Sequence, residues 1–82
     1  MPRILVVDDD ESMHPVLERV FRQFLPEWGV LVLGSPIEAV RRINTDPDPF
    51  DVVVSDFEMP GMFGDEVIMA ARRRADANTL CI

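Results

Sequence analysis

The sequence predicts an α/β fold in which helices cover both faces of a doubly wound parallel β-sheet. Short apolar runs rich in valine and isoleucine alternate along the chain with segments of helical periodicity, and aspartates follow two of these runs, the second after one serine. A strand that is followed by a helix and another strand crosses over in the right-handed sense, which leaves the two strands parallel. Because 82 residues are enough for one small core and too few for two, we expect a single domain.

Strands are expected at residues 3–9, 30–33, 51–56 and 79–82. The first and third contain the uninterrupted runs ILVV and VVV, which are typical of strands buried on both faces of a parallel sheet. The last contains the single cysteine, Cys81, which cannot form an internal disulfide and is expected to be a small core residue.

The first helix is expected over residues 11–25, where seven apolar residues recur at helical spacing. Pro15 falls in its first turn, where a missing amide hydrogen costs little, and Pro26 ends it. A third helix is expected over residues 64–74, and the arginines at its end complement the negative end of the helix dipole.

The start of the second helix is marked by a capping motif. Ser35 is a typical helix cap, Pro36 occupies the first helical position and Glu38 follows three residues after the cap. The helix should end before the proline-rich connector 44–49. Its inward side chains are expected to be Ile37, Val40 and Ile43.

Composition excludes several classes of function. The net charge is −7 and the pI is near 4.4, so this domain lacks the basic surface with which proteins neutralise the phosphates of nucleic acids. No apolar run reaches the roughly 18 residues that a membrane-spanning helix needs. The first residues lack the small-residue cleavage site of a secretory signal, so we expect a cytoplasmic protein that contacts neither nucleic acid nor membrane.

Acidic residues follow two of the predicted strands. Asp8 and Asp9 come at the end of the first strand, and Asp56 ends the third. Ligands of open parallel sheets bind beyond the carboxyl ends of the strands, so neighbouring strands would bring these carboxylates together. Such a cluster needs a cation, and oxygen ligands suit Mg²⁺. Asp56 is then the candidate nucleophile toward phosphorus. Alternatively, Asp8, Asp9 and Asp10 only favour the positive end of the first helix, and Asp56 caps a turn.

Two motifs make a resemblance specific. VVDD at residues 6–9 and DFEMPGMFG at residues 56–64 resemble the acidic pair and the D-x-x-M-P-x-x-x-G segment of the receiver domains of bacterial response regulators. The resemblance implies a flavodoxin-like fold of strand order 2-1-3-4 and a phosphoacceptor, Asp56. It also implies Mg²⁺ held by Asp9, Asp56 and the backbone carbonyl of Glu58, with Asp8 acting mainly through a metal-bound water. The implied partner is a histidine kinase or a phosphotransfer protein of a two-component system.

The sequence also departs from this family. Receiver domains continue with a helix, a strand and a last helix, and they carry a Ser or Thr and a Lys that read the phosphoryl group. On this resemblance, residues 1–82 are expected to be a partial receiver domain that ends in strand four. The first helix would cover its face of the sheet alone, so we expect a homodimer through that face or through the strand-four edge.

Two other functions compete with signalling. One is a phosphate-blind dimerisation module that keeps the receiver fold. The other is a magnesium-dependent aspartyl phosphohydrolase. Such enzymes use a second aspartate, two residues after the nucleophile, as acid/base, and this chain has Glu58 at that position. Otherwise the domain is not expected to be an enzyme. His14, alone near the start of the first helix, is expected to be a solvated surface residue.

Overall fold

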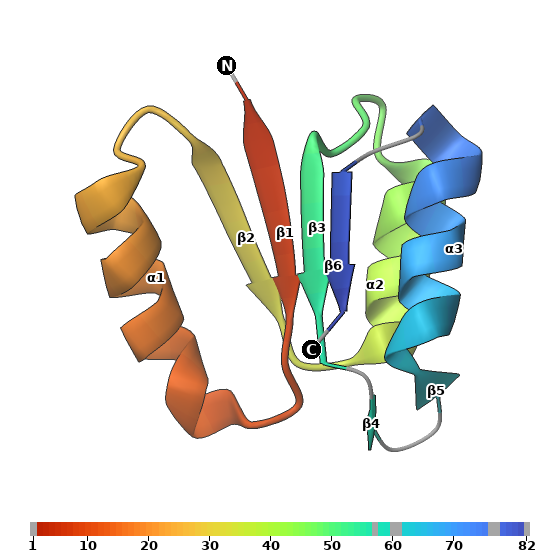
Figure 1. Cartoon of the computed structure of the whole chain (residues 1–82), viewed down its shortest axis with the longest axis horizontal. Helices are drawn as coiled ribbons and strands as arrows, with labels where there is room; N and C mark the ends of the chain where they lie inside the picture. The colour runs from red at the N-terminus through yellow and green to blue at the C-terminus, as the bar shows by residue number, and fades with distance from the viewer. Residues whose placement is uncertain (1, 57, 60–61, 76–77, 82) are drawn as a thin grey trace.

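The protein is a three-layered α/β domain whose centre is a parallel sheet. A computed structural model describes residues 2–56, 58–59, 62–75 and 78–81, with side chains for 2–56 and 65–74. Four strands, β1 (Arg3–Val7), β2 (Gly29–Leu33), β3 (Val52–Ser55) and β6 (Asn78–Cys81), pair in the order β2-β1-β3-β6 (Figure 1). All three pairings are parallel, which confirms the predicted fold and strand order.

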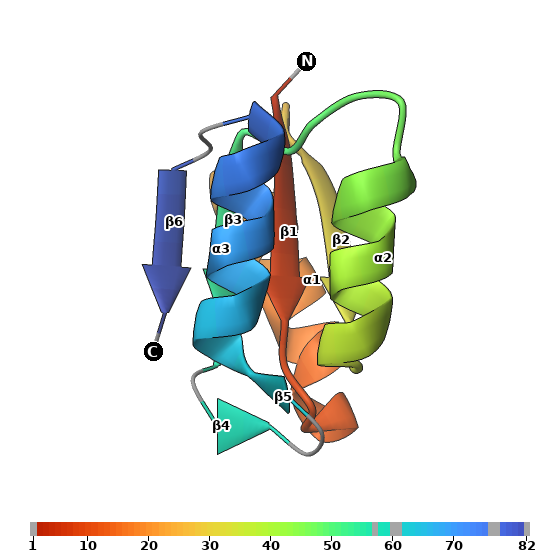
Figure 2. The same ribbon diagram turned by 90° about the vertical axis from the view of Figure 1, so that its right-hand side faces the viewer.

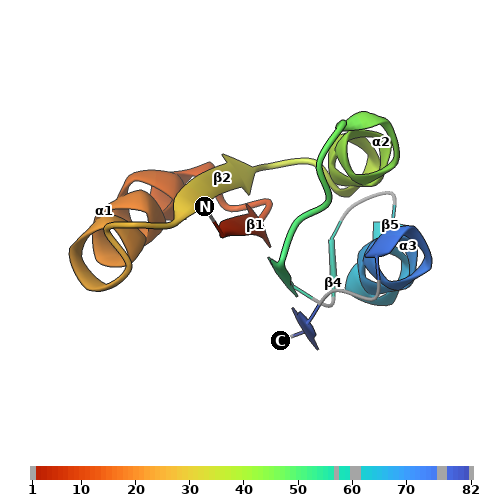
Figure 3. The same cartoon turned by 90° about the horizontal axis from the view of Figure 1, so that it is seen from above.

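The central strand β1 is buried on both faces, as its unbroken apolar run predicts. Ile4, Leu5, Val6 and Val7 are at most 4% exposed. Leu5 and Val7 belong to the core cluster under two helices, α2 (Pro36–Thr45) and α3 (Gly64–Ala75), together with Val53 and Val67. Helix α1 (His14–Phe24) lies on the opposite side of the sheet from α2 and α3, beside β2 (Figures 2 and 3). No helix within the described residues is long and apolar enough to cross a membrane.

The first helical segment begins later than predicted. Residues Glu11–Met13 form a 3₁₀ helix, η1, and the α-helix starts only at His14. The Asp10 carboxylate accepts hydrogen bonds from the Ser12 amide and hydroxyl, and the His14 amide donates to the carbonyl of Glu11 three residues earlier. Pro15 has no amide hydrogen with which to continue an α-helical ladder into this turn, so the chain takes the tighter form there.

Helix α2 corrects the predicted inward face. The Ser35 hydroxyl caps it through the Glu38 amide, as predicted. However, Ile37 is 59% exposed, whereas Ala39 and Ile43 are buried. Ala39 shares the core cluster with Ala70 and Ala71 of α3, so small side chains let the two helices approach each other closely. The helix also extends through Thr45, two residues into the predicted connector.

A short antiparallel hairpin, which the sequence analysis did not predict, leads from β3 to α3. It consists of β4 (Glu58–Met59) and β5 (Met62–Phe63), with Glu58 opposite Phe63. Two-residue strands show no measurable periodicity, so only the Pro-Gly pair between them signals a turn. The hairpin lies at the carboxyl end of β3 (Figure 1).

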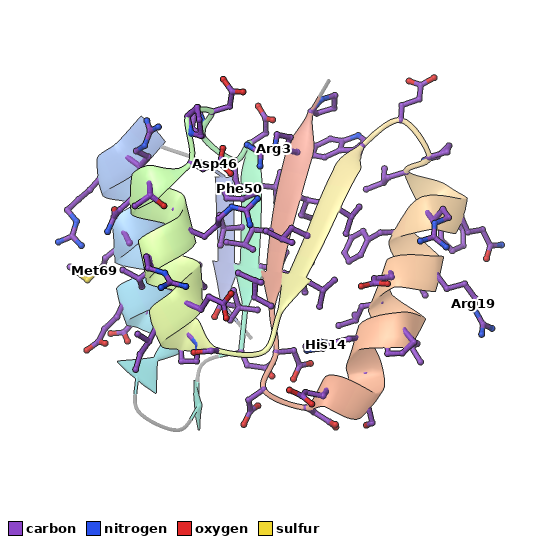
Figure 4. All side chains as sticks on the ribbon, turned by 180° about the vertical axis from the view of Figure 1, so that it is seen from behind. Arg3, His14, Arg19, Asp46, Phe50 and Met69 are labelled. Atoms are coloured by element: carbon purple, nitrogen blue, oxygen red, sulfur yellow. The ribbon has the colours of Figure 1, made fainter. Side chains whose placement is uncertain are left out.

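An arginine clamp fastens the opposite end of the sheet. The Arg3 guanidinium makes two hydrogen bonds to the Asp46 carboxylate, at 3.0 and 2.9 Å, and lies 4.4 Å over the Phe50 ring (Figure 4). Arg42 adds a third bond to Asp46, at 3.0 Å. The clamp joins the start of β1 to the loop before β3, and so aligns the two strands whose far ends carry the acids.

Candidate functional site

The acidic site is built by the register of three neighbouring strands. Val7, the last residue of β1, pairs with Ser55 of β3 and with Leu33 of β2. The next residues are therefore held as neighbours: the Asp56 amide donates to the Val7 carbonyl at 3.1 Å, and the Asp8 amide donates to the Leu33 carbonyl at 3.0 Å. Two carboxylates thus start from adjacent points on one edge of the sheet.

The structure brings together the three acids that the sequence analysis singled out. Carboxylate oxygens of Asp8, Asp9 and Asp56 all lie within 4.8 Å of one another. Asp8 and Asp56 are partly buried, and Asp9 is exposed. Burial raises the pKa of the Asp56 carboxyl from 3.8 to about 6, and a hydrogen bond with the Asp8 carboxyl and the charges of Asp8 and Asp9 act in the same direction.

Asp10, the third consecutive acid, has a different task. Its carboxylate is occupied at the start of η1, where it accepts from the Ser12 amide at 3.1 Å and from the Ser12 hydroxyl at 2.6 Å. Its own amide donates to Asp8 Oδ1 at 2.9 Å, which orients the Asp8 carboxylate. Asp10 therefore caps the first helical turn, as the alternative interpretation of the acids proposed.

His14 is not the solvated residue that the sequence analysis expected. Its Nε2 lies 2.7 Å from the backbone carbonyl oxygen of Asp8, in a partly buried position. The first turn of α1 faces back toward the end of β1, because η1 and the loop before it are only six residues long. Sequence periodicity assigns a residue to a helix face, but it does not show which loop that face meets.

Glu58 is described by its backbone only. It opens β4, two residues after Asp56, and β4 lies at the same end of the sheet as the acids (Figure 1). The expected ligand at this residue is the backbone carbonyl, so the prediction does not depend on the side chain. Its role as a ligand stays a prediction.

The chemistry of this cluster suits a hard divalent cation. The carboxylates supply oxygen atoms of the kind that Mg²⁺ prefers. Burial is the main cause of the raised pKa of Asp56, and the negative charges of the neighbouring acids add to it. A bound cation would offset those charges. The residues that would hold Mg²⁺ are thus present and close enough together to fit it.

Comparison with known proteins assigns the family. Residues 4–82 match the response regulator receiver domain model. The two-component response regulator ARR11 of Arabidopsis thaliana is 36% identical over 66 residues, which are 80% of this chain and 12% of that protein. The chain belongs to the response regulator receiver domain family.

Solved structures of receiver domains and related proteins support this family assignment. The structure titled adenylate cyclase from Rhodopirellula baltica is 39% identical with a TM-score of 0.76, over 96% of this chain and 56% of that one. The response regulator TrrA of Thermotoga maritima, solved in complex with Mg²⁺-BeF, is 30% identical with a TM-score of 0.80, over 96% of this chain and 66% of that one. TrrA in complex with the histidine kinase ThkA is 29% identical with a TM-score of 0.79, over 99% of this chain and 67% of that one. The chain therefore spans little more than half to two thirds of these structures.

Proposed function

We propose that this receiver domain accepts a phosphoryl group on Asp56 in two-component signalling, with Mg²⁺ held by Asp9, Asp56 and the backbone carbonyl of Glu58. The observation that carries the proposal is the meeting of Asp8, Asp9 and Asp56 within 4.8 Å at the ends of β1 and β3. The complex of TrrA with Mg²⁺-BeF supports it, because beryllofluoride is a phosphoryl mimic and TrrA is 30% identical to this chain.

The chain's own residues account for the transfer. An Asp56 carboxylate oxygen forms the new bond to phosphorus while the bond between phosphorus and the donor breaks, and the donor keeps that electron pair. With a pKa of about 6, Asp56 is mostly ionised at neutral pH and is able to attack. Asp8, oriented by the Asp10 amide, lies beside Asp56 directly after β1 and would hold a water bound to the cation. Bound Mg²⁺ would supply positive charge for the transferring oxygens.

The donor that fits this chemistry is a histidine kinase or a phosphotransfer protein, in the cytoplasm. The structure of TrrA with the kinase ThkA supports a kinase partner. The net charge of −7 opposes contact with nucleic acid through this domain. The role is that of a signalling domain rather than an enzyme.

The direct test is modification of Asp56. The protein is incubated with acetyl phosphate and Mg²⁺, and its intact mass is measured for wild type and Asp56→Asn. We expect a gain of one phosphoryl group in the wild type only, at a low rate. A phosphorylated species that persists in Asp56→Asn would assign the acceptor elsewhere.

We also propose that the domain forms a homodimer through the face that carries α1, or along the edge of β6. None of the residues of α1 is fully buried, and Phe24 is 70% exposed. A hollow of about 350 Å³ remains between α1 and β2. Apart from this hollow, the large apolar side chains exposed on α1 and at the end of η1 are Met13, Val16, Val20 and Phe24. Burying a few hundred Å² of such surface contributes several kcal/mol at about 25 cal/mol per Å², which favours a second copy over solvent.

The same exposed face favours a second candidate function, a phosphate-blind dimerisation module. The two functions differ in their response to a phosphodonor. Light scattering and intact mass, with and without acetyl phosphate, separate them: a dimer that never takes up a phosphoryl group is the module, and uptake on Asp56 is the signalling domain.

A further inference from the structure

His14 reaches from the first turn of α1 back to the acidic loop. Its Nε2 lies 2.7 Å from the carbonyl oxygen of Asp8. A carbonyl oxygen only accepts hydrogen bonds, so Nε2 carries the hydrogen and donates it. Figure 4 shows the labelled residue beneath the sheet, where the ends of β1 and β2 meet the start of α1.

The ring is also held from the side of β2. A Cβ atom added at Gly34 would lie 3.2 Å from His14 Cε1, closer than ordinary contact. Gly34 directly follows β2, so the imidazole packs closely against a backbone position where an added Cβ would require the ring to move by a few tenths of an ångström. His14 therefore contacts two loops at the carboxyl edge of the sheet as well as belonging to α1.

Hydrogen bonds hold Asp8 on both sides, including the carbonyl of the peptide group that joins Asp8 to Asp9. The Asp8 amide donates to the Leu33 carbonyl at 3.0 Å, and the Asp8 carbonyl accepts from His14 at 2.7 Å. That carbonyl belongs to the Asp8–Asp9 peptide group. Because a peptide group is planar, fixing its oxygen also fixes the amide nitrogen and the Cα of Asp9, the atom from which the Asp9 side chain extends.

We propose that His14 is a positioning residue for the acidic site: through the Asp8 carbonyl it holds the Asp8–Asp9 peptide in the orientation that directs Asp9 toward a Mg²⁺ ion beside Asp56. The proposal deepens the proposed function and rests on it for the identity of the cation. Asp9 needs this support because it is exposed, so packing alone does not restrict it.

Three variants separate a donor role from packing. His14→Leu removes the hydrogen-bond donor and keeps an apolar group against Gly34. His14→Gln places an amide NH₂ near the position of Nε2 and should restore the bond. Gln23→Leu makes a similar polar-to-apolar change at an exposed site on the same helix, away from the acids.

Magnesium affinity is measured by isothermal titration calorimetry on folded protein, below each variant's unfolding transition. Loss of an outer-shell partner typically weakens metal binding by 10–100-fold, and because His14 acts through the backbone we expect about tenfold for His14→Leu. We expect His14→Gln and Gln23→Leu to stay within about twofold of the wild type, the scale of a difference of a few tenths of a kcal/mol. Equal affinity in the wild type and His14→Leu would overturn the proposal.

A second measurement needs no metal. In the metal-free protein, the Asp9 amide should shift in the ¹⁵N–¹H spectrum and exchange faster with solvent in His14→Leu, and it should return toward the wild-type values in His14→Gln. If the wild type fails to bind Mg²⁺, the proposed function is wrong. The chemical shift and exchange rate of the Asp9 amide then still test whether His14 orders the loop. An unchanged Asp9 amide in His14→Leu would refute that ordering.

Gly34→Ala tests the same contact from the other side and remains informative if His14→Leu does not fold. The added Cβ must displace the ring by a few tenths of an ångström. We expect Mg²⁺ to bind about two- to threefold more weakly in Gly34→Ala, and the two substitutions to be non-additive because they act on one contact. Unchanged affinity in Gly34→Ala together with an unmoved Asp9 amide would count against the role of the ring.

Discussion

Replacing Asp56, the proposed phosphoacceptor, should stabilise the metal-free protein. In Asp56→Asn the side chain keeps its shape and can still donate to Asp8, but it never carries a charge. The wild-type carboxyl has its pKa raised from 3.8 to about 6 by burial and by the neighbouring acids. Between these two pH values the folded chain holds a proton that the unfolded chain has released. Stability therefore falls as pH rises through this window, and it stays at the lower level above pH 6.

The size of the effect follows from the shift. A pKa difference of about two units corresponds to roughly 3 kcal/mol, at 1.36 kcal/mol per unit. Asp56 is partly exposed, and solvent screening reduces the value, so we expect Asp56→Asn to gain about 1–2 kcal/mol at pH 7. For a domain of this size each kcal/mol moves the melting temperature by about 4–8 °C.

Urea unfolding in EDTA, at several pH values from 3 to 7.5, measures this difference. We expect the two proteins to be equally stable near pH 3, and the advantage of Asp56→Asn to open between pH 4 and pH 6. Added Mg²⁺ should narrow the gap at pH 7, because an ion that binds only the folded wild type stabilises it by mass action. A gap that is absent at pH 7, or that is constant from pH 3 upward, would contradict the explanation in terms of Asp56 ionisation.

Three further changes test other parts of the molecule. Asp9→Ala should weaken Mg²⁺ binding markedly, and equal affinity in a calorimetric titration would show that the metal site is wrongly assigned. Asp46→Asn should lower the urea midpoint at pH 7, because the Arg3 guanidinium holds the pKa of Asp46 well below its ordinary value of 3.8. The difference should shrink progressively as pH falls from 3.8 toward the lower pKa of the folded state, and a pH-independent difference would point to packing instead. Phe24→Glu should turn a dimer into a monomer in light scattering at micromolar concentration, whereas a well-folded wild-type monomer would contradict the proposed homodimer.

Much of the architecture could be predicted from the sequence because local patterns determine it. The runs ILVV and VVV identify β1 and β3 as buried strands, and Ser35-Pro36 marks the start of α2 within one residue. The alternation of strands and helices implies parallel pairing, and parallel strands carry Asp8, Asp9 and Asp56 to one edge. The family motifs then suggest a chemical role for each acid.

Other features were decided only by tertiary contacts. Helical spacing placed Ile37 on the inner face of α2, but the close approach of α3 buries Ala39 and leaves Ile37 exposed, because the direction from which a neighbour packs is not encoded in the period of a helix. Three consecutive aspartates look equivalent in the sequence, yet the turn into η1 uses Asp10 as a cap and directs the other two toward Asp56. His14 acquires its partner only when α1 folds back against the end of β1. Periodicity shows on which face of its own helix or strand a residue lies. The partner of a polar side chain depends instead on which distant loop the fold brings beside it.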